Sequence, residues 1–173
     1  MNRLMIILVL SMSIFSLGHA AEEPALFQPA GFYQLKNGSA CLARKAKVRE
    51  VELQECDVTV PYQLWRFDPI TYKERKRLMV RDKPADTCLE VSAGSSVDGG
   101  GVAVWSCSPK MNNQFWEVVP GDDGTYRLRV DHSKKCLMVK EILRKNETTP
   151  RSYIVQWACD TSAGQAWQLE SEK

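Results

Sequence analysis

The chain of 173 residues contains the pattern Gln-x-Trp three times, as Gln63-Leu64-Trp65, Gln114-Phe115-Trp116 and Gln165-Ala166-Trp167. The glutamines are equally spaced, at positions 63, 114 and 165. A cysteine precedes each copy, and a Cys-Leu dipeptide precedes that cysteine, as Cys41-Leu42, Cys88-Leu89 and Cys136-Leu137. Recurrence at a fixed period of this length is typical of a repeat architecture. The chain is therefore predicted to consist of three copies of one structural unit.

Short apolar stretches separated by turn-forming residues fill each unit. Stretches of this kind stand ahead of the Cys-Leu dipeptides, at 32–35, 78–80 and 126–130. Alternation over such short runs indicates β-strands, and glycine-rich or Asn- and Asp-containing segments between them indicate turns. No long amphipathic helical pattern is present. Three units of about four strands are too few for an ordinary propeller, so we predict an all-β fold that closes threefold around a shared core.

The tryptophan of each Gln-x-Trp is predicted to lie in that core, which places Trp65, Trp116 and Trp167 at its centre. A large apolar ring at the same place in each repeat is what a common core requires. Two roles are open for the glutamine: it ties a neighbouring loop, or it contributes to a ligand site.

Six cysteines and the N-terminal segment together indicate an exported, disulfide-stapled protein. Residues 1–20 have the positive start, apolar run and small residues of a signal peptide, with cleavage after Ala20 or one residue later. Segment 21–29 then leads to one domain, 30–171, with repeats at about 30–72, 73–122 and 123–171. Disulfides are expected in an oxidising compartment, extracellular or periplasmic. Without a Cys-x-x-Cys pair, and with His132 as the single histidine after residue 20, a metal site is not expected.

Threefold symmetry leaves two regular disulfide schemes. The cysteines pair within each repeat, or each repeat is linked to the next around the ring. The short enclosed loops favour the first scheme. Its pairs are Cys41 with Cys56, Cys88 with Cys107, and Cys136 with Cys159.

Charge excludes one class of partner. Lys and Arg (23) almost balance Asp and Glu (21), so no strong field points to nucleic acid. The local basic run Lys73, Arg75, Lys76 and Arg77 is interpreted as a solvated turn between strands, with contact to anionic glycans or membrane headgroups as the alternative.

The recurring order of Cys-Leu, a second Cys and Gln-x-Trp resembles the ricin-type β-trefoil lectin family from about Phe32 to Leu169. The resemblance implies a β-trefoil of three pseudo-equivalent four-stranded repeats that binds carbohydrate. A sugar-binding repeat of that family has Asp two residues after its first Cys, an aromatic residue two before its second Cys, and Asn before the Gln of Gln-x-Trp. A carboxylate and an amide bind sugar hydroxyls, and the ring stacks on the C–H face of the sugar.

Compared with this pattern, the second repeat matches best, although Glu replaces Asp and Ala103 stands where a polar residue is usual. Its implied sugar-binding residues are Glu90, Trp105, Asn113 and Gln114. The third repeat retains Trp157 and Gln165 as a weaker second site, but has Met138 at the acid position and Gly164 at the Asn position. The first repeat has Ala43, Gln54 and Tyr62 at the three positions, so it is expected to be structural only.

The leading hypothesis is therefore a secreted lectin module without cofactor, with a glycan of a cell surface or glycoprotein as its partner. One alternative is the binding subunit of a multi-component toxin, like the lectin-like subunits of cytolethal distending toxin, which would have a protein partner. Another is a trefoil that has lost sugar binding and binds a protein target. An enzyme is not expected, because no catalytic triad, metal constellation or phosphate-binding loop is present, and Glu90 with Asp98 makes a poor glycosidase pair.

Overall fold

The computed structural model describes residues 31–121, 123–143, 145 and 148–172. The predicted signal peptide and the segment 21–29 lie outside the described residues. Within the described part, no helix has the length and apolar character needed to span a membrane.

The described residues form twelve strands, four in each repeat, together with four short 3-10 turns. The first repeat contains β1 (Phe32–Asn37), β2 (Ala40–Arg44), β3 (Val51–Glu55) and β4 (Trp65–Tyr72). The second contains β5 (Arg75–Asp82), β6 (Cys88–Val91), β7 (Val102–Trp105) and β8 (Phe115–Pro120). The third contains β9 (Tyr126–Val130), β10 (Cys136–Ile142), β11 (Arg151–Trp157) and β12 (Gln168–Ser171). The four turns are η1 (Pro61–Gln63), η2 (Ser92–Gly94), η3 (Asn112–Gln114) and η4 (Ala163–Gln165).

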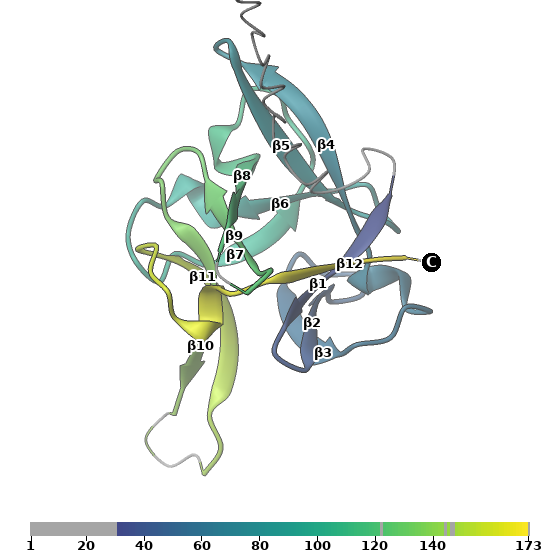
Figure 1. Ribbon diagram of the computed structural model, residues 1–173, viewed down its shortest axis with the longest axis vertical. Helices are drawn as coiled ribbons and strands as arrows, with labels where there is room; N and C mark the ends of the chain where they lie inside the picture. Colours follow the sequence, from purple (N-terminus) through teal and green to yellow (C-terminus); the bar gives the residue numbers. More distant parts are fainter. Residues whose placement is uncertain (1–30, 122, 144, 146–147, 173) are drawn as a thin grey trace, which may run out of the picture.

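The first and last strands of each repeat build a barrel. Antiparallel pairing runs from β12 through β1, β4, β5 and β8 to β9. A bridge between Tyr126 and Trp167, with N–H to O distances of 2.7 and 2.9 Å, closes the ring between β9 and the start of β12. The hairpins β2–β3, β6–β7 and β10–β11 contact one another through β3, β7 and β11. This arrangement confirms the predicted β-trefoil (Figure 1).

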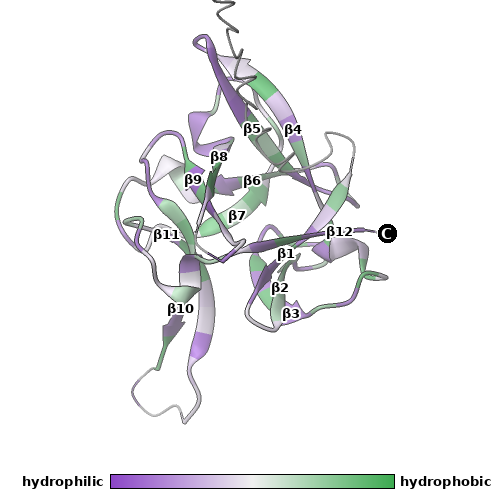
Figure 2. Ribbon diagram, viewed as in Figure 1, coloured by the Kyte–Doolittle hydropathy of each residue, from purple (hydrophilic) through white to green (hydrophobic). Residues whose placement is uncertain are grey.

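The tryptophans of the three Gln-x-Trp patterns meet in one core. Trp65, Trp116 and Trp167 are completely buried and belong to a single apolar cluster. Hydrophobic stretches of β6 and β7 lie in the middle of the molecule, whereas β5 near its hairpin tip and β12 are hydrophilic (Figure 2). Each indole N–H donates to the carbonyl of the leucine in the Cys-Leu dipeptide of its own repeat: Leu42 at 2.8 Å, Leu89 at 2.9 Å and Leu137 at 3.0 Å.

The glutamine of Gln-x-Trp ties a loop in all three repeats. It lies at the end of a 3-10 turn rather than on a strand, and its amide spans the second cysteine of the repeat. Gln114 donates to the carbonyl of Ser106 at 3.0 Å and accepts the N–H of Ser108 at 2.8 Å. Gln63 and Gln165 make the same pair of bonds around Cys56 and Cys159.

The disulfides pair within repeats. Cys41 is bonded to Cys56, Cys88 to Cys107 and Cys136 to Cys159. Each bond closes a loop of 15, 19 or 23 residues, so each is expected to contribute about 3 kcal/mol by restricting the unfolded chain.

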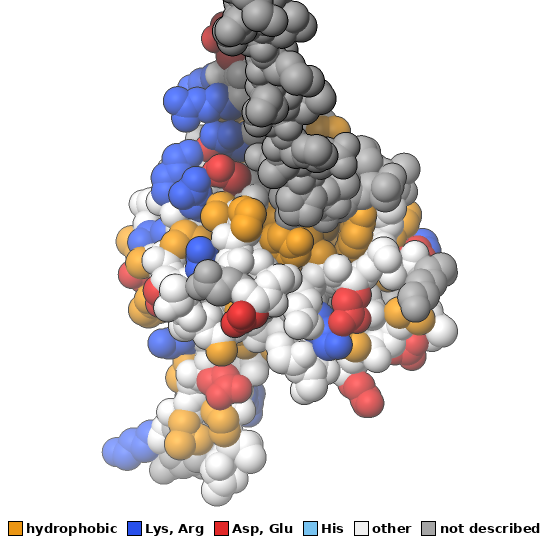
Figure 3. Space-filling view, in the orientation of Figure 1, with side chains coloured by type: hydrophobic (Ala, Val, Ile, Leu, Met, Phe, Trp, Pro, Cys, Tyr) orange, Lys and Arg blue, Asp and Glu red, His pale blue; other side chains and the backbone are white. Residues whose placement is uncertain are grey.

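Two long hairpins project from opposite ends of the molecule, β4–β5 and β10–β11 (Figure 1). The basic run lies at the tip of the first, where Lys and Arg side chains gather (Figure 3). Lys73 and Glu74 form the turn with positive φ angles of 47° and 62°. Arg77 is held by Asp131 at 2.9 Å, which leaves Lys73, Arg75 and Lys76 as the exposed cations of the run.

Replacing Trp116 by Ala should destabilise the domain severely. The change removes a completely buried ring and leaves the carbonyl of Leu89 without its donor. We expect a loss of about 3–5 kcal/mol of unfolding free energy, measured by urea titration. The matched control is Trp105→Ala, because that ring is 37% exposed and lies outside the core cluster. The control should cost about 1 kcal/mol, and equal losses in the two variants would contradict the core assignment.

Candidate functional site

The second repeat carries a pocket of about 460 Å³ at the open side of the β6–β7 hairpin. The lining residues come from four local elements, β6, η2, β7 and the segment that ends in η3. They are Glu90, Ala93, Gly94, Trp105, Met111 and Asn113. The pocket therefore gathers residues spread over 24 positions of one repeat, from 90 to 113.

Strand register brings the acid and the ring to one face of the hairpin. Glu90 pairs with Ala103, and Cys88 pairs with Trp105. Side chains alternate along a strand, so Glu90, Ala103 and Trp105 point to the same side while Leu89 and Val104 face the core. The small Ala103 opposite Glu90 leaves room above the carboxylate.

Glu90 and Asn113 form the polar floor of the pocket. Both are largely buried, at 7% and 6% exposure. The Asn113 amide donates to the carbonyl of Val91 at 2.9 Å and lies 3.4 Å from Glu90 Oε2. Gln114 donates to the same Glu90 oxygen at 3.0 Å. Among the described residues, neither Glu90 Oε1 nor Asn113 Oδ1 has a protein partner in these bonds, so two acceptors remain for a ligand.

Gln114 lies behind this floor. Its side chain is completely buried, and its donors and acceptor are occupied by Glu90 and by the backbone around Cys107. It therefore fixes the carboxylate rather than forming part of the pocket surface. Gln165 is equally buried in the third repeat.

Trp105 forms the wall of the pocket, and a residue of the first repeat supports it. The guanidinium carbon of Arg49 lies 3.1 Å from the centre of the Trp105 ring. Residues 49–50 flank β7 on the edge away from β6: the Val104 N–H donates to the Arg49 carbonyl at 2.8 Å, and Glu50 bridges to Ala103. Arg49 therefore contacts the ring without itself lining the pocket.

The third repeat has the same frame with its polar groups removed. Met138 stands at the acid position, where its sulfur lies 3.9 Å from the Gln165 amide. Lys140 Nζ lies 4.7 Å from the centre of the Trp157 ring. At Gly164 the turn approaches β10 so closely that a Cβ would lie 2.5 Å from the carbonyl oxygen of Val139. An asparagine therefore does not fit at the position that Asn113 occupies in the second repeat.

In the first repeat Gln54 stands at the position that Trp105 has in the second. Ala43 is buried, and the Gln54 amide donates to Glu52 at 2.9 Å. This repeat contributes to the candidate site through Arg49 instead.

The sequence pattern named Glu90, Trp105 and Asn113, and the structure brings these three together. The pattern did not predict Arg49, Ala93, Gly94 or Met111, because the positions of these residues depend on how loops pack against the strands of their own and neighbouring repeats. Alignment of the repeats would have placed Ala93 and Gly94 just after the acid, but the sequence holds no signal for Arg49.

The sequence model of the ricin-type beta-trefoil lectin domain matches residues 76–173. No curated protein sequence matches the chain.

Solved structures with the same fold include a designed threefold-symmetric protein, ThreeFoil, which is 23% identical with a TM-score of 0.65 over 81% of this chain and 98% of that one. A Polyporus squamosus lectin bound to a human-type influenza-binding epitope is 16% identical with a TM-score of 0.64 over 84% of this chain and 50% of that one. The cytolethal distending toxin of Haemophilus ducreyi is 21% identical with a TM-score of 0.60 over 83% of this chain and 84% of the matched one. These likenesses show the fold.

Gly164 is predicted to be required by the close approach of η4 to β10. Gly164→Ala should destabilise the domain by about 1–3 kcal/mol, because backbone on both sides must move to admit the methyl group. Gly101→Ala is the matched control, since a Cβ there meets no atom within 4 Å. Thermal unfolding of the two variants measures the difference. A Gly164→Ala protein as stable as the control would mean that η4 is free to move away from Val139.

Proposed function

The chain belongs to the ricin-type beta-trefoil lectin domain family, and from that membership we propose that it is a carbohydrate-binding lectin whose working site is the pocket of the second repeat. The proposal rests on one observation above the others: a partly exposed tryptophan stands beside two buried acceptors that have unused oxygens. These oxygens accept hydrogen bonds from the hydroxyls of a sugar, and the C–H face of the sugar stacks on the indole ring. Glu90 and Asn113 therefore orient the sugar, and Trp105 supplies most of the contact area.

Such a site binds weakly by itself. One ring and a few hydrogen bonds correspond to a dissociation constant of about 1 mM for a monosaccharide. Useful affinity then requires dense glycans or a second binding site. Binding is proposed without catalysis, since the pocket holds one carboxylate and no second acid or nucleophile among its lining residues. The three disulfides support folding in an oxidising compartment, which fits export through the predicted signal peptide.

A second candidate function is binding to a protein partner, as a subunit of a toxin assembly. The exposed Ile142 and Leu143 at the projecting β10–β11 hairpin favour it, with exposures of 41% and 61%. The fold shared with cytolethal distending toxin is compatible with it. Silence of the purified protein on a glycan array, together with capture of one defined partner, would support this candidate over the first.

Trp105→Ala tests the proposed site. The variant should lose glycan binding while keeping the fold, because the ring faces the pocket and not the core. A glycan array selects the sugar, and titration of parent and variant with that sugar gives the affinities. Trp157→Ala is the control and should bind like the parent. Unchanged affinity in Trp105→Ala would refute the site.

Changes at Glu90 separate its charge from its length. Glu90→Gln should weaken binding by about 1.5–3 kcal/mol, because a charge-assisted hydrogen bond to a sugar hydroxyl is lost. Glu90→Asp should also weaken it, since the shorter acid withdraws from Gln114, which now lies 3.0 Å from Oε2. The same titration measures both. Tighter binding by Glu90→Asp would mean that the site merely tolerates the longer acid.

Arg49 is expected to preorganise the ring. Removing its guanidinium frees Trp105 to leave its orientation, and a cation–π contact at an exposed place contributes about 0.5–1 kcal/mol. Arg49→Ala should therefore weaken binding about two- to fivefold without changing which sugar is bound. Lys47→Ala, on the same loop, is the control. Tighter binding by Arg49→Ala would instead identify Arg49 as a competitor for the ring.

A further inference from the structure

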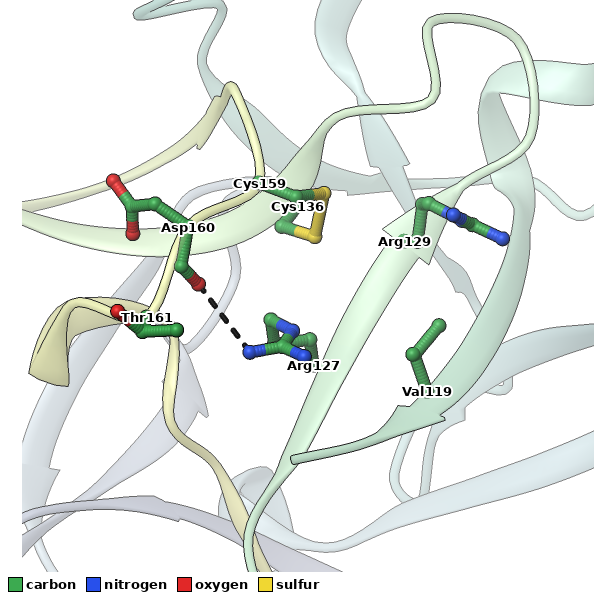
Figure 4. A pocket seen from close by; sticks show the side chains of 7 residues that line it. All are labelled: Val119, Arg127, Arg129, Cys136, Cys159, Asp160 and Thr161. Carbon is green, nitrogen blue, oxygen red and sulfur yellow. Dashed lines mark hydrogen bonds between the residues drawn. A yellow bond between two sulfur atoms is a disulfide. The ribbon is translucent and has the colours of Figure 1, made fainter. Parts of the chain in front are cut away.

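A second hollow, separate from the proposed sugar pocket, lies beside the Cys136–Cys159 disulfide of the third repeat (Figure 4). Its volume is about 270 Å³, slightly below the range of about 300–1,000 Å³ typical of drug-sized ligands. The hollow is therefore of the right size for a single sugar ring. Its walls are formed by Val119, Arg127, Arg129, Cys136, Cys159, Asp160 and Thr161.

The place equivalent to Arg127 is filled by apolar side chains in the second repeat. In the second repeat Met79 pairs with Phe115, and both pack beside Cys88 of the disulfide in one apolar cluster. In the second repeat Leu78 pairs with Trp116, and the next pair is Met79 with Phe115. In the third repeat Tyr126 and Trp167 form the pair that corresponds to Leu78 and Trp116. The third repeat therefore has Arg127 in place of Met79 and Ala166 in place of Phe115. The ring that stands opposite Met79 in the second repeat is therefore absent opposite Arg127. Ala166 lines an adjoining hollow of about 190 Å³, which shares Arg127, Asp160 and Thr161 with the first.

In the first repeat the same place is also filled. Gln34 stands where the third repeat has Arg127, and its amide donates to Gln63 at 2.9 Å within the buried interior. Leu64 stands where the third repeat has Ala166 and is buried. Of the three equivalent places, the third alone combines a small residue with a cation.

Arg127 has donors to spare. Among the described residues, its guanidinium donates from Nη1 to the carbonyl of Asp160 at 3.4 Å, which is long for a hydrogen bond. A guanidinium carries five N–H donors, and this one is half-buried. Its neighbour Arg129 is already paired with Glu117 at 2.8 Å, and Figure 4 shows its head pointing away from Arg127. Within the part of the chain that the structure describes, Arg127 is thus the cation of the hollow without a carboxylate partner, and a carboxylate is the group that matches its fork.

Asp160 lies at the rim of the hollow with its carboxylate directed outward. The Asp160 carboxylate accepts the Ser162 N–H at 2.9 Å and points away from Arg127 (Figure 4). Hydrogen bonding by Ser162 and the charges of Arg127 and Lys140 hold the pKa of Asp160 below its usual value, so it is charged at neutral pH. Because this carboxylate is directed away from Arg127, it does not form an ion pair with the guanidinium, and the cation stays accessible in the hollow.

We infer that this hollow is a second carbohydrate site, specific for an acidic sugar of the uronic acid class. The sugar carboxylate binds the Arg127 guanidinium, and the C–H face of the ring lies against Val119 and the disulfide. The site is independent of Trp105 and of the pocket in the second repeat. Two sites of different specificity on one chain would let it select glycans that carry both sugars.

The test compares methyl β-glucuronide with methyl β-glucoside, which differ at the carboxylate. Both are titrated by NMR into the Trp105→Ala protein, so that the second-repeat pocket does not contribute. The glucuronide should bind at least about tenfold tighter than the glucoside, and its affinity should fall with added salt. Acetate should bind at least about tenfold more weakly than the glucuronide, because it lacks the hydroxyls and the ring.

Two variants in the same background locate the site. Arg127→Met, which restores the residue of the second repeat, should abolish glucuronide binding. Arg75→Met removes an exposed cation at the tip of the β4–β5 hairpin, outside the hollow, and is the matched control that should retain binding. Ala166→Phe places the ring of the second repeat opposite Arg127, in the adjoining hollow that shares this residue, and should also abolish binding without removing a charge. Glucuronide binding by Ala166→Phe therefore tests the site if Arg127→Met fails to fold.

Equal affinity for the two glycosides, or an Arg127→Met or Ala166→Phe protein that binds glucuronide like its parent, would overturn the inference. Failure of the lectin site in the second repeat is a different result. It would appear as unchanged neutral-glycan binding in Trp105→Ala, whatever the glucuronide does.

Discussion

The hydrogen bond from each Gln-x-Trp indole to the carbonyl of the Cys-Leu leucine is the constraint on which the three repeats depend. It ties the start of a barrel strand to the second strand of the same repeat, at 2.8 to 3.0 Å in all three. The glutamine two residues earlier ties the segment around the second cysteine, and the disulfide joins that segment to the first cysteine. A buried ring whose N–H is satisfied adds apolar burial without the cost of an unpaired donor. Each repeat is thus held by one covalent and three hydrogen-bonded links, and the repeats share one core.

This frame leaves the outer surfaces of the repeats free to differ. The place between the hairpin of the second and third strands and the Gln-x-Trp turn is a pocket in the second repeat. In the third repeat Lys140 lies over the ring of Trp157, and in the first repeat Gln54 replaces the ring. The opposite side of the disulfide varies independently, with Phe115 filling the second repeat and Ala166 opening the third. Arg49 shows that a repeat without a pocket still serves a neighbour, because its loop supports the Trp105 ring.

The parts of the structure that the sequence could predict are those that the symmetry repeats. Three equal spacings and three cysteine pairs led to the trefoil, and a pattern within one repeat led to Glu90, Trp105 and Asn113. Contacts that break the symmetry could not be predicted, because they depend on how loops dock across repeats. Arg49 reaches Trp105 over 56 positions, and Arg127 gains its importance from the absence of a ring at Ala166. The sequence left two roles open for the glutamines, tying a loop or binding a ligand. The hydrogen bonds around Cys56, Cys107 and Cys159 show that they tie loops.

The indole N–H signals of the five tryptophans test the central claim most directly. In a hydrogen-exchange experiment followed by a titration with the glycan chosen on the array, three signals should exchange slowly and two should exchange fast. The slow ones belong to Trp65, Trp116 and Trp167, which are buried and bonded to leucine carbonyls. The glycan should shift the fast signal of Trp105 and leave that of Trp157 in place. Fast exchange at any of the three core rings, or a glycan that shifts Trp157 and not Trp105, would contradict this account.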